Sequence, residues 1–120
     1  MVDNCVFLSR LKMAVEKAEF VLSICTGAAL LARCGLLDGK KATSNKMALD
    51  WVKSTGAAVY WQERARWVTD GKFYTSSGVS AGIDMALGFV EDQWGRAQAE
   101  WIARRIEYLW NDKKENDPFA

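Results

Sequence analysis

The chain contains no histidine, and this absence restricts its chemistry more than any other feature of its composition. A Ser-His-Asp triad, a Cys-His pair, a histidine-ligated zinc ion and histidine acid–base catalysis are all excluded within the chain. Chemistry must come from cysteine, carboxylate or hydroxyl side chains, or from backbone amides. We expect neither a cofactor nor a bound metal.

A strong charge of either sign is also missing. Sixteen lysines and arginines against 15 aspartates and glutamates leave a net charge of +1, which offers no attraction for nucleic acid or for an anionic membrane. No apolar run reaches the roughly 18 residues of a membrane-spanning helix. Asp3, Asn4 and Arg10 interrupt the apolar N-terminal stretch, so it is no signal peptide. Three cysteines without paired spacing then predict a reducing, cytoplasmic setting.

What remains is the composition of one folded domain. The 120 residues have a mass of 13.4 kDa, half of them are apolar and 26% are charged. We expect residues 1–110 to form the domain. Residues 111–120 are polar and hold the only proline, which predicts a flexible tail.

Helical and strand patterns alternate along this domain. Helices are predicted over 6–18, 28–33 and 46–54, the last capped by Asn45, and strands over 20–24, 41–44 and 57–61. A hairpin over 66–75 turns at Asp70-Gly71, and two helices follow, broken at Gly95. This order predicts an α/β fold with a parallel sheet that is covered on both faces.

The first of the two C-terminal helices carries a clear apolar stripe. Its members recur at helical spacing and are expected to face the core: Ile83, Ala86, Leu87, Val90 and Trp94. The next helix carries Ala99, Ile102, Ile106 and Leu109 on one face. Core or interface packing is the expected role of the tryptophans in this region.

The segment Ser23-Ile24-Cys25-Thr26-Gly27 stands where a strand becomes a helix, with small residues two before and two after Cys25. This is the layout of a nucleophile elbow, in which Gly27 lets the backbone pass closely. The helix N-terminus favours a thiolate, and the amides of Thr26 and Gly27 are candidates to hold an oxyanion. The alternative is an inert core cysteine. Packing is the expected role of Cys5 and Cys34.

Three segments resemble the PfpI superfamily, the class I glutamine amidotransferase-like proteins, with isonitrile hydratase as the nearest branch. They read SICTGAALLA (23–32), GLLDGKKAT (35–43) and TSSGVSAGIDMAL (75–87). The resemblance implies a flavodoxin-like three-layer α/β sandwich that forms a homodimer and acts on a small molecule. It further implies Cys25 as the nucleophile beside Thr26, in a pocket with Gly27, Asn45, Ser76 and Gly78.

The chain departs from the family pattern in two places. The family domain is longer at its N-terminus, where its acidic partner for the cysteine lies, so we expect this chain to be a C-terminal portion. Asn45 occupies a position where the family usually has histidine. This argues against the glyoxalase III and peptidase-like branches. As a replacement for the missing acid, Asp84 competes with a simpler role, since a carboxylate near a helix N-terminus is favourable in itself.

Two functions from different classes follow from these residues. The first is an isonitrile hydratase-like lyase, weak or inactive without the acidic partner. The alternative is a non-catalytic or redox-responsive protein that senses oxidation at Cys25. The sensing domain of a transcription regulator ranks last, because nothing after Trp110 is long enough for a helix-turn-helix module.

Overall fold

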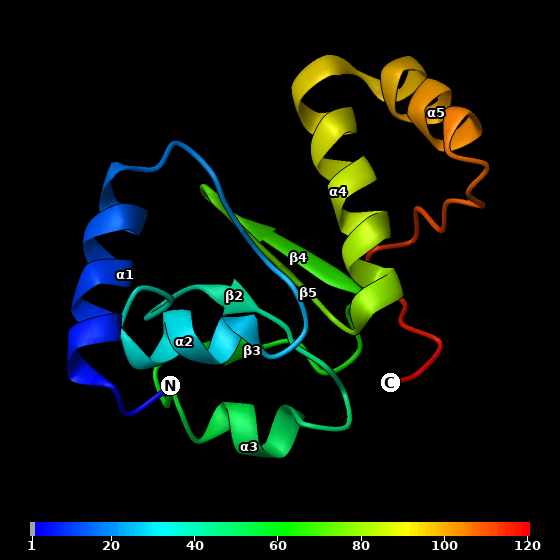
Figure 1. The fold of residues 1–120 in the computed structure, drawn as a ribbon. Coiled ribbons are helices and arrows are strands. Elements are labelled where there is room, and N and C mark those ends of the chain that lie inside the picture. The colour runs from blue at the N-terminus through cyan, green and yellow to red at the C-terminus, as the bar shows by residue number, and fades with distance from the viewer. Residues whose placement is uncertain (1) are drawn as a thin grey trace.

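A computed structural model describes residues 2–120. The elements follow the predicted order: α1 (Cys5–Lys17), β1 (Val21–Ser23), α2 (Gly27–Arg33), β2 (Lys41–Ala42), α3 (Leu49–Lys53), β3 (Tyr60–Trp61), β4 (Trp67–Asp70), β5 (Phe73–Ser76), α4 (Val79–Trp94) and α5 (Arg96–Arg105). In Figure 1, α1 and α2 lie on one side of the β4–β5 hairpin and α4 lies on the other.

The alternation of side chains along β5 creates this layering. Phe73 packs into a core with Val15 of α1 and Leu31 of α2. The next residue, Tyr74, points to the opposite face and packs with Trp67 and Met85. A sheet with helices on both faces is therefore confirmed, and it is the three-layer α/β arrangement expected.

The strands form two small groups. Strand β5 lies between β1, to which it is parallel, and β4, to which it is antiparallel, while β2 pairs with β3 in parallel. The hairpin turns at Gly71-Lys72, one residue later than predicted, with Gly71 at a φ of 61°. Among the described residues no strand covers the outer edge of β1, where Leu22 is 38% exposed.

Helix α4 buries the opposite face to the one predicted. Its buried residues are Ala81, Gly82, Asp84, Met85, Leu87 and Gly88. Of the predicted stripe only Leu87 is buried, whereas Ile83 and Trp94 are 41% and 68% exposed. Small residues face the sheet because α4 lies close to it: a Cβ on Gly88 would come within 2.9 Å of the Trp67 ring. Three members of the predicted stripe, Ile83, Ala86 and Trp94, are thus exposed.

Helix α3 is shorter than predicted, beginning at Leu49 instead of residue 46. The Asn45 side chain does not cap it. Its Oδ1 accepts the Met47 amide at 2.9 Å in a local turn, and Lys46 is drawn into the interior.

The C-terminal segment differs from the flexible tail that its composition predicts. Helix α5 ends at Arg105, and residues 111–120 return to the body of the protein. The Arg66 amide donates to Lys114 O at 2.6 Å, and the Asp117 amide donates to Arg64 O at 2.8 Å. Asp117 is buried between two cations, which holds the polar segment in place.

No helix within residues 2–120 is long and apolar enough to cross a membrane.

Candidate functional site

The predicted strand–turn–helix around Cys25 is present. Strand β1 ends at Ser23, α2 begins at Gly27, and Cys25 between them has a φ of 58°, a conformation that non-glycine residues rarely adopt. Both backbone polar groups of Cys25 are held. Its amide donates to Ser77 O at 2.9 Å, and its carbonyl accepts the Ser44 hydroxyl at 2.7 Å. The surroundings therefore impose the strained turn.

The close approach near this turn involves another glycine than the predicted Gly27. A Cβ on Gly27 would lie 3.6 Å from the Ser23 Cβ, an ordinary contact. A Cβ on Gly82 in α4 would come within 2.7 Å of the Ile24 side chain, next to Cys25. The lack of a side chain at Gly82 lets α4 approach the turn. In the sequence, a glycine inside an amphipathic helical pattern indicates such a close approach.

The two amides predicted to hold an oxyanion differ in their availability. The Gly27 amide donates to Ile24 O at 3.1 Å, so it is already used within the turn. Thr26 is exposed at the start of α2, and its side chain makes no capping hydrogen bond. The Thr26 amide is therefore the remaining candidate.

The three cysteines lie in different surroundings, and all are free thiols. Cys25 is half-buried, so it is not sealed into the core. Cys5 is exposed, against the expectation of packing. Cys34 is half-buried with its Sγ 3.5 Å from Leu8 O, and burial raises the pKa of its thiol.

A cavity of about 260 Å³ lies beside the Cys25 turn. Its wall includes Asn45 and Gly78 from the predicted pocket, together with Lys46, Arg66, Ser77 and Phe119. Ser77 connects the two features, since its carbonyl accepts the Cys25 amide. Cys25, Thr26 and Gly27 are not part of this wall. Ser76 is fully buried, and its hydroxyl donates to Ser23 O at 3.2 Å, which gives it a structural role.

A buried ion cluster stands behind the cavity wall. Arg66 Nε donates to Asp84 Oδ2 at 2.8 Å, and Arg66 Nη2 lies 2.7 Å from the same oxygen in an ion pair. Asp117 Oδ2 lies 3.3 Å from Lys46 Nζ, and Asp117 Oδ1 lies 3.6 Å from Arg66 Nη1. All four side chains are at least nine-tenths buried, and two positive and two negative charges balance. Asp84 is thus an ion-pair partner, neither a free acid nor a simple dipole partner.

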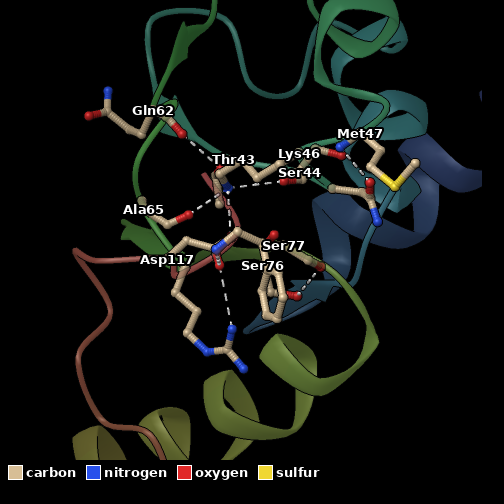
Figure 2. Close-up of polar contacts among 12 residues, drawn as sticks. Thr43, Ser44, Lys46, Met47, Gln62, Ala65, Ser76, Ser77 and Asp117 are labelled. Atoms are coloured by element: carbon tan, nitrogen blue, oxygen red, sulfur yellow. Dashed lines mark hydrogen bonds and ion pairs between the residues drawn. The ribbon is translucent and has the colours of Figure 1, made fainter.

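The ammonium group of Lys46 is surrounded by acceptors. Nζ donates to Thr43 Oγ1 at 2.9 Å, to Ser44 O at 3.2 Å and to Ala65 O at 2.6 Å. Figure 2 shows Lys46 among these groups, with Asp117 next to it. Burial lowers the pKa of Lys46, while Asp117 opposes this change.

Opposing effects also act on Asp117. Burial raises the pKa of its carboxyl. Hydrogen bonds from Ser77 and the Phe119 amide, together with Lys46, lower this pKa by a larger amount, so that it lies below its ordinary value. The roles of Lys46, Arg66 and Asp117 were not predicted, because residues so far apart in the sequence show no common pattern. Among residues 2–120, no group of His, Cys, Asp or Glu side chains is placed to hold a metal ion.

Comparison with known proteins places this geometry in context. Residues 1–92 match the DJ-1/PfpI family. Isonitrile hydratase from Pseudomonas putida is 34% identical over 101 residues, a region that covers 84% of this chain and 43% of the enzyme. The chain therefore spans less than half the length of that relative.

Solved structures show the same relationship. A ThiJ/PfpI family protein from Pseudomonas syringae superposes with a TM-score of 0.78 at 30% identity, covering 92% of this chain and 44% of that one. Oxidized DJ-1 from Toxoplasma gondii superposes with a TM-score of 0.67 at 27% identity, covering 90% and 56%.

Proposed function

The chain belongs to the DJ-1/PfpI family, and from this premise we propose that it is an isonitrile hydratase-like protein with Cys25 as its nucleophile. The observation that carries the proposal is the left-handed turn at Cys25, which Ser77 and Ser44 hold from both sides next to a cavity. Strain maintained at a half-exposed cysteine is typical of a functional position. The sequence similarity to isonitrile hydratase supplies the substrate class, a small molecule with an electrophilic carbon.

The proposed reaction adds water to an isonitrile through a covalent intermediate. The Cys25 sulfur forms a bond to the terminal carbon, and that carbon takes up a proton to give a thioimidate. Water then adds to the carbon–nitrogen double bond, and the nitrogen takes a proton. The carbon–sulfur bond breaks, releasing a formamide and restoring the thiol. The Thr26 amide is our candidate donor to the developing negative charge.

The proposed reaction also needs a general acid to supply the protons. The buried carboxylates of Asp84 and Asp117 are both paired with cations, so neither is proposed as the proton donor. We propose that a carboxylate from another segment completes the reaction. Without such a group the chain is expected to be weak or inactive.

The test is the loss of an isonitrile in the presence of purified protein. Wild type is compared with Cys25→Ala and, as a matched control, with Cys34→Ala. Cys25→Ala should abolish turnover, whereas Cys34→Ala should retain it. Equal rates for wild type and Cys25→Ala would contradict the proposal.

The second candidate function is oxidation sensing at Cys25. A half-exposed thiol beside a helix N-terminus is open to oxidation to sulfenic or sulfinic acid, and one structural relative was solved in an oxidized form. Peptide mass analysis after mild peroxide should find oxygen first on Cys25. Earlier oxidation of Cys5 or Cys34 would contradict this function.

We also propose a homodimer in a cytoplasmic setting. The exposed apolar residues of α4, Val79, Ile83 and Trp94, form a face suited to a second copy, and free cysteines fit a reducing compartment. Sedimentation should give a dimer for wild type and a monomer for Ile83→Asp. A wild-type monomer would contradict the dimer.

A further inference from the structure

Two thiols away from the Cys25 turn share one cavity. The cavity has a volume of about 250 Å³, and its wall is formed by Cys5, Leu8, Ser9, Lys12 and Cys34. Cys5 is the first residue of α1, and Cys34 follows the last residue of α2. The fold therefore places two thiols from different helices at one site, where the start of α1 meets the end of α2.

Two contacts hold these helix ends together. The Cys34 thiol donates to Leu8 O at 3.5 Å. Arg33 Nη2 donates to Asp3 Oδ1 at 2.9 Å and so ties the end of α2 to the segment that leads into α1. In Figure 1 the N-terminal end of the chain lies beside the end of α2. Cys5 and Cys34 therefore lie on segments that are already in contact.

The two thiols are about one helical turn apart along α1. Leu8 lies three residues after Cys5, and side chains at this spacing are neighbours on one face of a helix. Because Cys34 contacts Leu8, its separation from Cys5 along the helix axis is on the order of 5 Å. A disulfide needs Cβ atoms about 4 Å apart. Cys5 is in the first turn of α1, where helices commonly fray, so a small backbone shift is enough to bring the sulfurs together.

Cys25 is too far from Cys34 to compete for it. The seven residues of α2 lie between these two cysteines, and at 1.5 Å per residue they span about 10 Å. Cysteines whose Cα atoms are more than about 7 Å apart cannot be bridged without movement of the backbone. The pair of Cys5 and Cys34 is therefore separate from the Cys25 turn.

The two thiols differ in a way that suits two successive steps. Cys5 is exposed, so a dissolved disulfide can reach its sulfur. Cys34 is half-buried, and burial raises the pKa of its thiol, while the nearby Lys12 opposes this change. A buried thiol with a raised pKa reacts slowly with dissolved reagents. Cys5 should therefore react first, and Cys34 should attack only a sulfur that is already beside it.

We propose that Cys5 and Cys34 form a reversible disulfide that fastens the start of α1 to the end of α2. The Cys5 thiolate attacks oxidised glutathione, which forms a mixed disulfide and releases one glutathione thiol. The Cys34 thiolate then attacks the Cys5 sulfur, forms the Cys5–Cys34 bond and releases the second glutathione thiol. The two protein thiols lose two electrons and two protons, which the glutathione disulfide takes up. This modification site is independent of the proposed reaction at Cys25.

Incubation of the folded chain in buffers of reduced and oxidised glutathione tests the proposal. Trypsin leaves the three cysteines on separate peptides, because it cleaves after Arg10, Lys17, Arg33 and Lys40. Mapping without a reductant should find the Cys5 peptide linked to the Cys34 peptide, lighter than their sum by two hydrogens, in a chain that runs as a monomer on a denaturing gel. Cys34→Ser is the matched variant. It should form no link and should retain glutathione on Cys5 instead.

The ion pair between Asp3 and Arg33 provides a second measurement. The glutathione ratio at which half of the chains are linked measures the effective concentration of one thiol at the other. Asp3→Asn removes the charge that helps to hold the helix ends together, and should lower this effective concentration by about two- to fivefold, the range of an exposed ion pair. Glu63→Gln removes the exposed partner of Lys53 elsewhere in the chain, and is the matched control that should leave it unchanged.

Three results would overturn the proposal. They are glutathione on Cys5 without a linked peptide at any ratio, a link from either residue to Cys25, and a link that forms only between two chains. An equal effective concentration in Asp3→Asn and wild type would overturn the role of the ion pair. The exchange adds no oxygen to sulfur, so peptide mass distinguishes it from oxidation of Cys25 by peroxide. None of these results depends on Cys25 acting as a nucleophile.

Discussion

The contact between Gly82 and Ile24 predicts an unusual response to a Gly82→Ala substitution. In most helices this change stabilises the protein by about 1 kcal/mol, because alanine has the higher helix propensity. Here the new Cβ would come within 2.7 Å of Ile24 Cγ2 and 3.0 Å of Ile24 Cγ1. Overpacking of this kind costs about 1–3 kcal/mol. The net result should be a destabilisation of about 1 kcal/mol, the difference between these two effects.

A second substitution separates the two contributions. Ile24→Ala removes all three side-chain atoms that crowd the new Cβ, and Ile24 is 49% exposed, so the protein should still fold. In that background Gly82→Ala should stabilise by about 1 kcal/mol, the propensity gain alone. The double-mutant cycle should therefore give a coupling energy of about 2 kcal/mol.

Urea denaturation of the four proteins measures this coupling, with the m-value as a check that the compactness of the unfolded state is unchanged. The two substitutions should also have non-additive effects on the rate at which Cys25 is alkylated, since Ile24 is the neighbour of Cys25 in the turn. If Gly82→Ala changes the free energy of unfolding equally in both backgrounds, then α4 does not press on the Cys25 turn.

Three further predictions concern the buried polar groups. Arg66→Met leaves the carboxylates of Asp84 and Asp117 buried with one cation fewer, and should lower the free energy of unfolding by about 3–5 kcal/mol in urea. The depressed pKa of Asp117 stabilises the fold above the unfolded pKa of about 3.9, and this stability is lost as the pH falls. Acid unfolding of Asp117→Asn should consequently show a weaker pH dependence below about pH 5, and an unchanged profile would refute it. Burial, followed by the hydrogen bond to Asp92, raises the pKa of Tyr74 to about 12, so its contribution to stability should decline above about pH 10. Tyr74→Phe should remove the tyrosine that ionises near pH 12 in an ultraviolet titration, and persistence of that step would contradict the assignment.

The C-terminal segment shows why composition misleads about order. Polar residues around a single proline predict a loose tail, because they bury little apolar surface. Asp117 nevertheless finds two cations and a backbone carbonyl in the interior. Partners from positions 46, 64 and 66 cannot be read from the segment itself.

Helix α4 shows the same limit for packing. The spacing of Ile83, Val90 and Trp94 predicts a helix, and the helix forms. Which face it buries depends on how closely the sheet approaches, and at close approach Gly82 and Gly88 fit where larger side chains do not. Periodicity identifies an apolar face but does not identify its partner.

Local sequence by itself determined the features that depend on near neighbours along the chain: the order of helices and strands, the alternation of Phe73 and Tyr74 across β5, and the strand–turn–helix at Cys25. These follow from backbone geometry and side-chain periodicity, which act over a few residues. Only the tertiary structure decided which residues form the cavity wall and the ion cluster, and where Phe119 lies, because these features need side chains from distant segments to meet. A buried charge is stable only next to a counter-ion, and the local sequence does not indicate where that counter-ion lies.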